Sequence, residues 1–176
     1  MIVVKNDPLA YRWLRKAYEN AYDFSDDPST QNGSVLIPAG HISNLPCFGA
    51  NHFPHNVEVT PERLADRDTK LFFMEHAERD AIYTAAIRGI PTLNATLYVP
   101  WFACADCARA IISTGITRVV GHKQMMDKTP ERWVKSIQAA DVMLDEAGVQ
   151  RVYYDGPIFT ATEHFKVLFN GEFWTP

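Results

Sequence analysis

Three side chains in the sequence have the chemistry and the spacing of a zinc site. His76 precedes a segment of helical periodicity, and Cys104 and Cys107 form a C-x-x-C pair at the start of a second such segment. Thiolates three residues apart in the first turn of a helix can face one ion, and the helix dipole stabilises their negative charge. Three protein ligands leave the fourth position of a tetrahedral zinc open to water. The spacing therefore predicts a catalytic zinc.

Glu78 is the candidate proton carrier of this site. It follows His76 by two residues, so its carboxyl is expected to reach the water of the zinc without ligating the metal. Zinc lowers the pKa of a bound water to about 7, which prepares it to attack an electrophilic ring carbon. A carboxylate there can take the proton and deliver it to the ring nitrogen and to leaving ammonia. H-x-E combined with C-x-x-C is typical of zinc-dependent nucleobase deaminases.

Four segments extend this pattern along the chain. In order, they read D-P-S-T-Q-N-G at residues 27–33, G-A-N-H-F-P at 49–54, F-F-M-E-H-A-E at 72–78 and L-Y-V-P-W-F-A-C-A-D-C at 97–107. In residue type, spacing and order they resemble segments of the deoxycytidylate (dCMP) deaminase family, within the cytidine deaminase superfamily. The likeness covers roughly residues 8–155.

The resemblance implies an α/β protein with the three-layer α/β/α cytidine deaminase-like fold and a mixed five-stranded sheet. It implies Zn²⁺ held by His76, Cys104 and Cys107, Glu78 as general acid/base, and hydrolysis of dCMP to dUMP and ammonia in pyrimidine metabolism. Family members commonly form hexamers regulated by nucleoside triphosphates, so a homo-oligomer and a nucleotide effector are also implied. The implied substrate-binding residues are Asn51, which would bond the sugar, Phe102, which would pack beside the pyrimidine, and His52, Ala77 and Ala103.

The chain departs from the family pattern at three places. Ala103 stands where a proline normally precedes the first zinc cysteine, His52 stands where the loop has glycine, and residues 158–176 lie outside the likeness. Because His52 and Ala103 fall where selectivity is set, a deaminase of a 5-substituted dCMP, of a free nucleoside or of a base remains an alternative.

Composition favours one globular domain over residues 1–176. The chain is 47% hydrophobic and 22% charged, with a net charge of −4, so no general positive field is available to hold a polyanion. A polynucleotide deaminase is therefore disfavoured, although it shares the chemistry, and a non-catalytic zinc protein is disfavoured by Glu78. Three cysteines and the lack of a signal-like or long apolar segment favour the cytoplasm and disfavour secretion and membrane spanning.

The elements that must position these residues follow from periodicity. Residues 49–68 have loop composition and are expected to form a binding loop. The order of the other elements predicts a mixed sheet of about five strands with helices on its faces. Helices are predicted at residues 8–22, 76–89, 104–113, 130–147 and from about 160 to 170, strands at 95–99, 116–121 and 149–154, and a hairpin at 34–37 and 42–48.

Other side chains have two interpretations. Cys47 with His52 and His55 could form a second zinc site, but a buried thiol at Cys47 is favoured. Aromatic residues after residue 160 are expected to form core or subunit contacts rather than a base-stacking platform, and His41 and His122 to be turn residues. The candidate phosphate-binding cations are Arg63, Arg67, Lys70 and Lys123.

Overall fold

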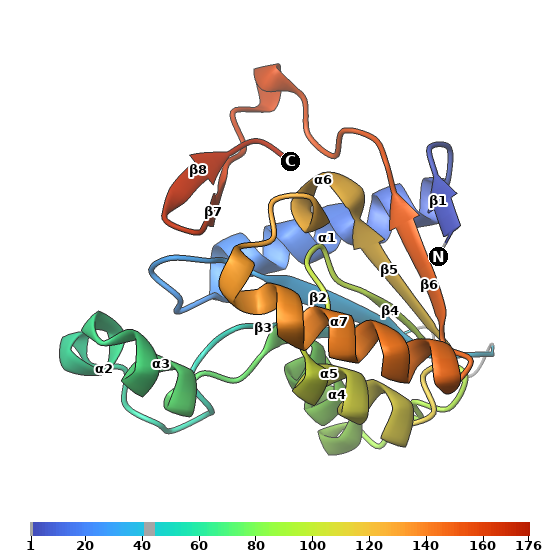
Figure 1. Cartoon of the computed structure of the whole chain (residues 1–176), viewed down its shortest axis with the longest axis horizontal. Coiled ribbons are helices and arrows are strands. Elements are labelled where there is room, and N and C mark those ends of the chain that lie inside the picture. The colour runs from blue at the N-terminus through green and yellow to red at the C-terminus, as the bar shows by residue number, and fades with distance from the viewer. Residues whose placement is uncertain (1, 41–44) are drawn as a thin grey trace.

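The computed structural model describes residues 2–40 and 45–176, and a six-stranded sheet forms its centre (Figure 1). The strand order is β1-β6-β5-β4-β2-β3; β1, β6, β5 and β4 are parallel, and β2 runs antiparallel to both of its neighbours. The bounds are Ile2–Val4 for β1, Gly33–Ile37 for β2, Cys47–Ala50 for β3, Thr96–Tyr98 for β4, Arg118–His122 for β5 and Gln150–Tyr154 for β6.

The predicted fold class is confirmed, but the sheet has six strands rather than five. The added strand is β1, which pairs with β6 at the edge of the sheet. Its three residues are too few for an alternating pattern to be recognised in the sequence. Residues 41–44, which include His41 and the start of the predicted strand 42–48, lie outside the described residues.

Helices cover both faces of the sheet (Figure 1). On one face α1 (Pro8–Phe24) packs against Val35, Val120 and Val152. On the other face α4 (Ala77–Ile87), α5 (Ala105–Ser113) and α7 (Glu131–Glu146) pack against strand residues that include Leu97 and Val119. Successive strand residues point to opposite faces, which is why both faces are buried and the structure has three layers.

The start of α4 lies close against β3. A Cβ atom on Gly49 of β3 would stand 2.3 Å from the carbonyl oxygen of Ala77, the first residue of α4. Only glycine permits this approach. The contact fixes the distance of the α4 N-terminus from the sheet, and therefore the positions of His76 and Glu78.

The predicted loop at residues 49–68 is partly wrong, because short helices begin at Pro61. These are α2 (Pro61–Ala65) and α3 (Arg67–Phe73). Thr60 caps the first and Asp66 caps the second, each accepting a backbone N–H three residues on. A capping residue followed by proline is a helix-start signal that outweighs the loop-like composition around it. A further short helix, α6 (Lys123–Met126), follows β5.

The predicted helix after residue 160 is wrong. A single 3₁₀ turn (Ala161–Glu163) is followed by a separate hairpin of β7 (Val167–Phe169) and β8 (Glu172–Trp174). Asn170 and Gly171 have φ of 52° and 84°. Positive φ at both positions of a two-residue turn selects Asn-Gly, and this local preference outweighs the helical spacing of the aromatic residues.

Two further expectations concern the core. Phe169 is buried and packs with the residues under α1, so the interpretation of the tail aromatics as core residues is confirmed for this side chain. His122 is not a turn residue: it ends β5, is fully buried, and lies within 2.7 Å of the Tyr18 hydroxyl. Burial lowers the pKa of His122 to about 4, so this imidazole is neutral near pH 7.

No helix among the described residues combines the length and hydropathy needed to cross a membrane.

Candidate active site

His76, Cys104 and Cys107 converge at two helix N-termini. His76 is the N-cap of α4, Cys104 is the N-cap of α5, and Cys107 lies in the first turn of α5. His76 Nδ1 lies 3.4 Å from each sulfur, and the two sulfurs are 3.5 Å apart. The three side chains predicted to hold zinc therefore lie together, with their donor atoms within 4.8 Å of one another.

The triangle of donor atoms fits a zinc ion. Tetrahedral zinc with Zn–S of about 2.3 Å and Zn–N of about 2.0–2.1 Å separates two sulfurs by about 3.8 Å and sulfur from nitrogen by about 3.5–3.6 Å. The edges of the triangle are within about 0.3 Å of these values. The donor set of one imidazole and two thiols also suits zinc rather than magnesium or calcium, which prefer oxygen. The hydrogen bond between the Cys104 and Cys107 side chains lowers the pKa of Cys104 to about 4, so one thiolate forms readily.

The side chains of Cys47, His52 and His55 do not form a second group of three metal donors. Within residues 2–40 and 45–176, the group of His76, Cys104 and Cys107 is the one that brings three such donors together. Cys47 is a fully buried free thiol in β3 that contacts the apolar core. The interpretation of Cys47 as a small buried residue agrees with this position.

Glu78 lies in the first turn of α4, where its side chain is only 3% exposed. Burial raises the pKa of the Glu78 carboxyl to about 7. A carboxyl with a pKa near the working pH can both accept and donate a proton, because both of its forms are populated. Position and acidity therefore suit the carriage of a proton beside the donor triangle.

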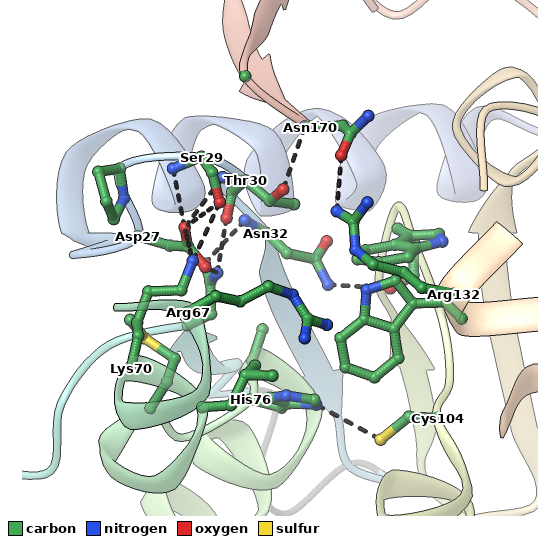
Figure 2. Close-up of a pocket in the computed structure, with 18 of the residues that line it drawn as sticks. Asp27, Ser29, Thr30, Asn32, Arg67, Lys70, His76, Cys104, Arg132 and Asn170 are labelled. Carbon is green, nitrogen blue, oxygen red and sulfur yellow. Dashed lines mark hydrogen bonds and ion pairs between the residues drawn. The ribbon is translucent and has the colours of Figure 1, made fainter. Parts of the chain in front are cut away.

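A cavity of about 410 Å³ opens over His76, Glu78 and Cys104. This volume is within the usual range of small-molecule sites, roughly 300–1,000 Å³. Figure 2 shows His76 and Cys104 at one end of the cavity and Asn170 and Arg132 toward the other. Of the predicted substrate-binding residues, the cavity is lined by Asn51, Ala77 and Phe102, and not by His52 or Ala103.

The side chain of Asn51 is engaged by the protein itself. Its Oδ1 accepts hydrogen bonds from the Ser25 hydroxyl (2.6 Å) and the Asn32 backbone N–H (2.8 Å). Its Nδ2 donates to the carbonyl oxygen of Thr30 (2.6 Å). These bonds join β3 to the segment that carries the D-P-S-T-Q-N-G motif. Asn51 thus fixes one wall of the cavity, and a direct contact with the sugar stays a prediction.

A buried ion pair between Lys70 and Asp27 stabilises the same wall of the cavity. Lys70 of α3 donates to Asp27 Oδ1 (2.7 Å) and to the Ser29 hydroxyl (3.0 Å), and both charged side chains are less than 10% exposed. The charge of Lys70 is thereby neutralised inside the protein. Removing one partner of such a pair leaves an uncompensated buried charge, so the pair fixes α3 to this wall.

The cations that line the cavity differ in part from those suggested by the sequence. Arg67 lines the cavity with a half-exposed side chain that pairs with Asp68 at 3.3 Å. Arg132 of α7 lines it without a carboxylate within ion-pair distance among the described residues. Neither Arg63 nor Lys123 lines the cavity. Arg63 stacks on Phe73, and Lys123 pairs with Asp127. Sequence reasoning did not identify Arg132, Trp133 and Asn170, because they follow the recognised motifs and reach the cavity only through the fold.

His52 turns away from the cavity and pairs with Asp80 of α4, at 3.1 Å. The hydrogen bond from His52 to Asp80 raises the pKa of the imidazole to about 9 from 6.5. A raised folded-state pKa means that the stabilisation is present in full below pH 6.5 and is lost as the pH rises through about 9. The pair is expected to contribute on the order of 2 kcal/mol to the free energy of unfolding.

We therefore expect His52→Gln to flatten the pH dependence of stability. Urea unfolding at pH 6.5 and about pH 9.5 should show a larger loss of unfolding free energy in the wild type than in this variant. His55→Gln, at an exposed neighbouring histidine, is the matched control and should follow the wild type. Equal pH profiles for wild type and His52→Gln would show that the pair contributes nothing.

Comparison with known proteins gives a consistent set of relatives. Residues 9–123 match the family model of the cytidine and deoxycytidylate deaminase zinc-binding region. A deaminase from the luxG 3′ region of Aliivibrio fischeri is 32% identical over 142 residues, which is 79% of this chain and 91% of that protein. Deoxycytidylate deaminase of Homo sapiens is 30% identical over 130 residues, which is 71% of this chain and 68% of the human protein.

Solved structures share the fold. The dCMP deaminase of cyanophage S-TIM5 in complex with dCMP and dUMP superposes with a TM-score of 0.63 at 17% identity, covering 84% of this chain and 98% of that one. The family model ends at residue 123, before α7 and the C-terminal hairpin begin. The elements that carry Arg132 and Asn170 therefore lie beyond the matched region.

Proposed function

The chain belongs to the cytidine and deoxycytidylate deaminase family, and on this premise we propose that it hydrolyses dCMP to dUMP and ammonia with one zinc ion. The observation that carries the proposal is the donor triangle of His76, Cys104 and Cys107 beside buried Glu78, at one end of a nucleotide-sized cavity. The human relative and the cyanophage structure, both deoxycytidylate deaminases, support this choice of substrate.

Zinc bound by these three residues supplies a water of lowered pKa as the nucleophile. The reaction forms a bond from C4 of the cytosine ring to the water oxygen and breaks the bond from C4 to the exocyclic nitrogen. A carboxylate oxygen of Glu78 takes a proton from the attacking water and delivers it to the ring nitrogen N3. Glu78 then carries the second proton to the departing amine, so that ammonia leaves as a neutral molecule.

The residues predicted to bind substrate have different roles in this proposal. Phe102, Ala77 and Asn51 line the cavity, which supports contact of Phe102 with the pyrimidine and of Ala77 with its edge. Ala103 is proposed to act through its backbone, next to the ligand Cys104. His52, which pairs with Asp80, is proposed to shape the loop from outside the cavity rather than to touch the nucleotide.

Charge supports a nucleotide over a nucleoside. Arg132 adds a positive charge to the cavity that no carboxylate among the described residues pairs with. Arg67 lines the cavity but pairs with Asp68, and Lys70 is neutralised by Asp27. A phosphate monoester carries about −1.5 to −2 at pH 7, and a guanidinium group such as that of Arg132 can bind it through charge-assisted hydrogen bonds. A free nucleoside or base would leave Arg132 without a counter-charge.

We also propose one deaminase domain over residues 1–176 that assembles as a homo-oligomer and acts in the pyrimidine metabolism of the cytoplasm, with a nucleotide effector. Large exposed apolar side chains, such as Phe72 at 90% and Ile87 at 87%, are candidates for subunit contacts. The free thiols at Cys47, Cys104 and Cys107 suit a reducing compartment.

Parallel turnover of related substrates tests the proposed function. Zinc-loaded protein is offered dCMP, CMP, 5-methyl-dCMP, deoxycytidine and cytosine, and ammonia and the product are quantified. We expect the highest kcat/KM for dCMP, with dUMP as the product. A higher kcat/KM for deoxycytidine, cytosine or 5-methyl-dCMP would show that this compound, and not dCMP, is the preferred substrate. The absence of turnover with every compound would reject the proposed function.

A further inference from the structure

Hairpin β7–β8 forms part of the cavity although it lies far from the motifs in the sequence. Asn170 and Gly171, the two turn residues at its tip, line the cavity together with residues of α3, α4 and α7. In Figure 1 the hairpin lies above the N-terminal end of α7. The tip is therefore placed to touch a substrate that extends from the zinc end of the cavity.

Hydrogen bonds fix the tip to the segment at residues 29–31. The backbone N–H of Gly171 donates to the carbonyl oxygen of Ser29 (2.8 Å), and that of Asn170 donates to the Thr30 hydroxyl (3.1 Å). Gln31 and Leu168 exchange two further bonds, through the backbone N–H of each. Because the 29–31 segment is itself held by the pair of Asp27 and Lys70, the hairpin tip has a defined position on the cavity wall.

From this position Asn170 holds Arg132. Nη2 of Arg132 donates to Oδ1 of Asn170 at 2.6 Å. An amide oxygen orients a guanidinium group without neutralising it, whereas a carboxylate would cancel its charge. Asp27 does cancel the charge of Lys70 in the same cavity. Arg132 thus keeps its positive charge, and its orientation depends on the tail of the chain.

An aromatic wall separates this cation from the donor triangle. The ring of His76 contacts Trp133 at 6.0 Å between centroids, Trp133 contacts Trp101 at 5.8 Å, and Trp101 contacts Phe169 of β7 at 5.0 Å. A pyrimidine whose C4 lies at the zinc end can extend its sugar and phosphate along this wall. Its 5′-phosphate would then arrive at the end where Figure 2 shows Arg132 and Asn170.

We propose that hairpin β7–β8 is a specificity element of the site, in which Asn170 orients Arg132 to bind the 5′-phosphate of the substrate. The inference rests on the proposed function, since it takes the substrate to be a deoxycytidine nucleotide. Arg132 is the binding residue, and Asn170 is a positioning residue that acts through it. The tail then decides how strongly the enzyme prefers a nucleotide to a nucleoside.

The test is the ratio of kcat/KM for dCMP to kcat/KM for deoxycytidine. We expect Arg132→Ala to lower this ratio about 100-fold and Arg132→Lys to restore part of it. Asn170→Gly, which keeps a residue that accepts positive φ, should lower the ratio about 10-fold, mainly through a higher KM for dCMP. The double variant should match Arg132→Ala alone, because Asn170 acts through Arg132. Lys135→Ala, an exposed cation on the same helix outside the cavity, is the control.

Two results would overturn the inference while leaving the proposed function intact. One is a wild-type preference for dCMP that Asn170→Gly does not change. The other is a fall in kcat/KM in Asn170→Gly that is equal for dCMP and deoxycytidine, or an effect of Asn170→Gly that adds to the effect of Arg132→Ala. Both are expected of a merely structural residue. A wild type that lacks any preference for dCMP over deoxycytidine would instead reject the nucleotide as substrate, and the role of the hairpin with it.

Discussion

Glu78→Gln is expected to remove turnover of dCMP while the protein keeps its zinc. Gln has nearly the shape of Glu, but its amide neither accepts nor releases a proton near neutral pH, so the transfer from water to N3 and to the amine is lost. Proton transfer by a positioned side chain contributes roughly 10²–10⁴-fold, and kcat should fall by this factor. The measurement is kcat from ammonia release, with the zinc content of each preparation determined by elemental analysis.

The control for this variant is Glu146→Gln, at an exposed carboxyl at the end of α7. It should retain wild-type kcat and zinc content. If Glu78→Gln turned over dCMP at the wild-type rate with the same zinc content, Glu78 would not be the proton carrier. If it lost its zinc as well as its activity, Glu78 would be required for metal binding instead.

Cys107→Ala is expected to lose both zinc and activity. Cys107 is fully buried and supplies one corner of the donor triangle, so its removal leaves two ligands from the chain. A ligand that binds only the folded protein stabilises it, by about 4 kcal/mol when free zinc is 1,000-fold above its Kd. Zinc should therefore raise the Tm of the wild type and have no effect on the Tm of the variant.

Cys47→Ala separates loss of zinc from loss of packing. It removes another fully buried thiol, but one in β3 and outside the donor triangle. It should lower the Tm while zinc binding and dCMP turnover persist. Wild-type zinc affinity in Cys107→Ala, or loss of zinc in Cys47→Ala, would contradict the assignment of the ligands.

The grouping of His76, Cys104 and Cys107 and the main elements could be predicted because their signals are local. A C-x-x-C pair at a helix start places both sulfurs on one side by helical geometry alone, and His76 has the same relation to α4. Asp7 followed by Pro8 predicts the start of α1, and Asp7 does cap it. Such patterns need no knowledge of how distant segments meet.

The remaining parts of the site depend on contacts between distant segments. Arg132 meets Asn170 across 38 residues, and Lys70 meets Asp27 across 43, and neither pair shares a pattern in the sequence. The hairpin itself did carry a local signal, Asn170-Gly171, which aromatic spacing obscured. Asn51 illustrates another limit: its place in the cavity follows from the resemblance, but the bonds that engage its amide come from Ser25, Thr30 and Asn32.

The most direct measurement of the central claim is a zinc titration of metal-free protein with dCMP present, in which zinc bound, dUMP formed and ammonia released are followed together. We expect dUMP and ammonia in equal amounts, with a rate that rises linearly with zinc and levels off at one equivalent per chain. A protein that binds one zinc and forms no dUMP, or that forms dUMP at a rate independent of zinc, would contradict the account.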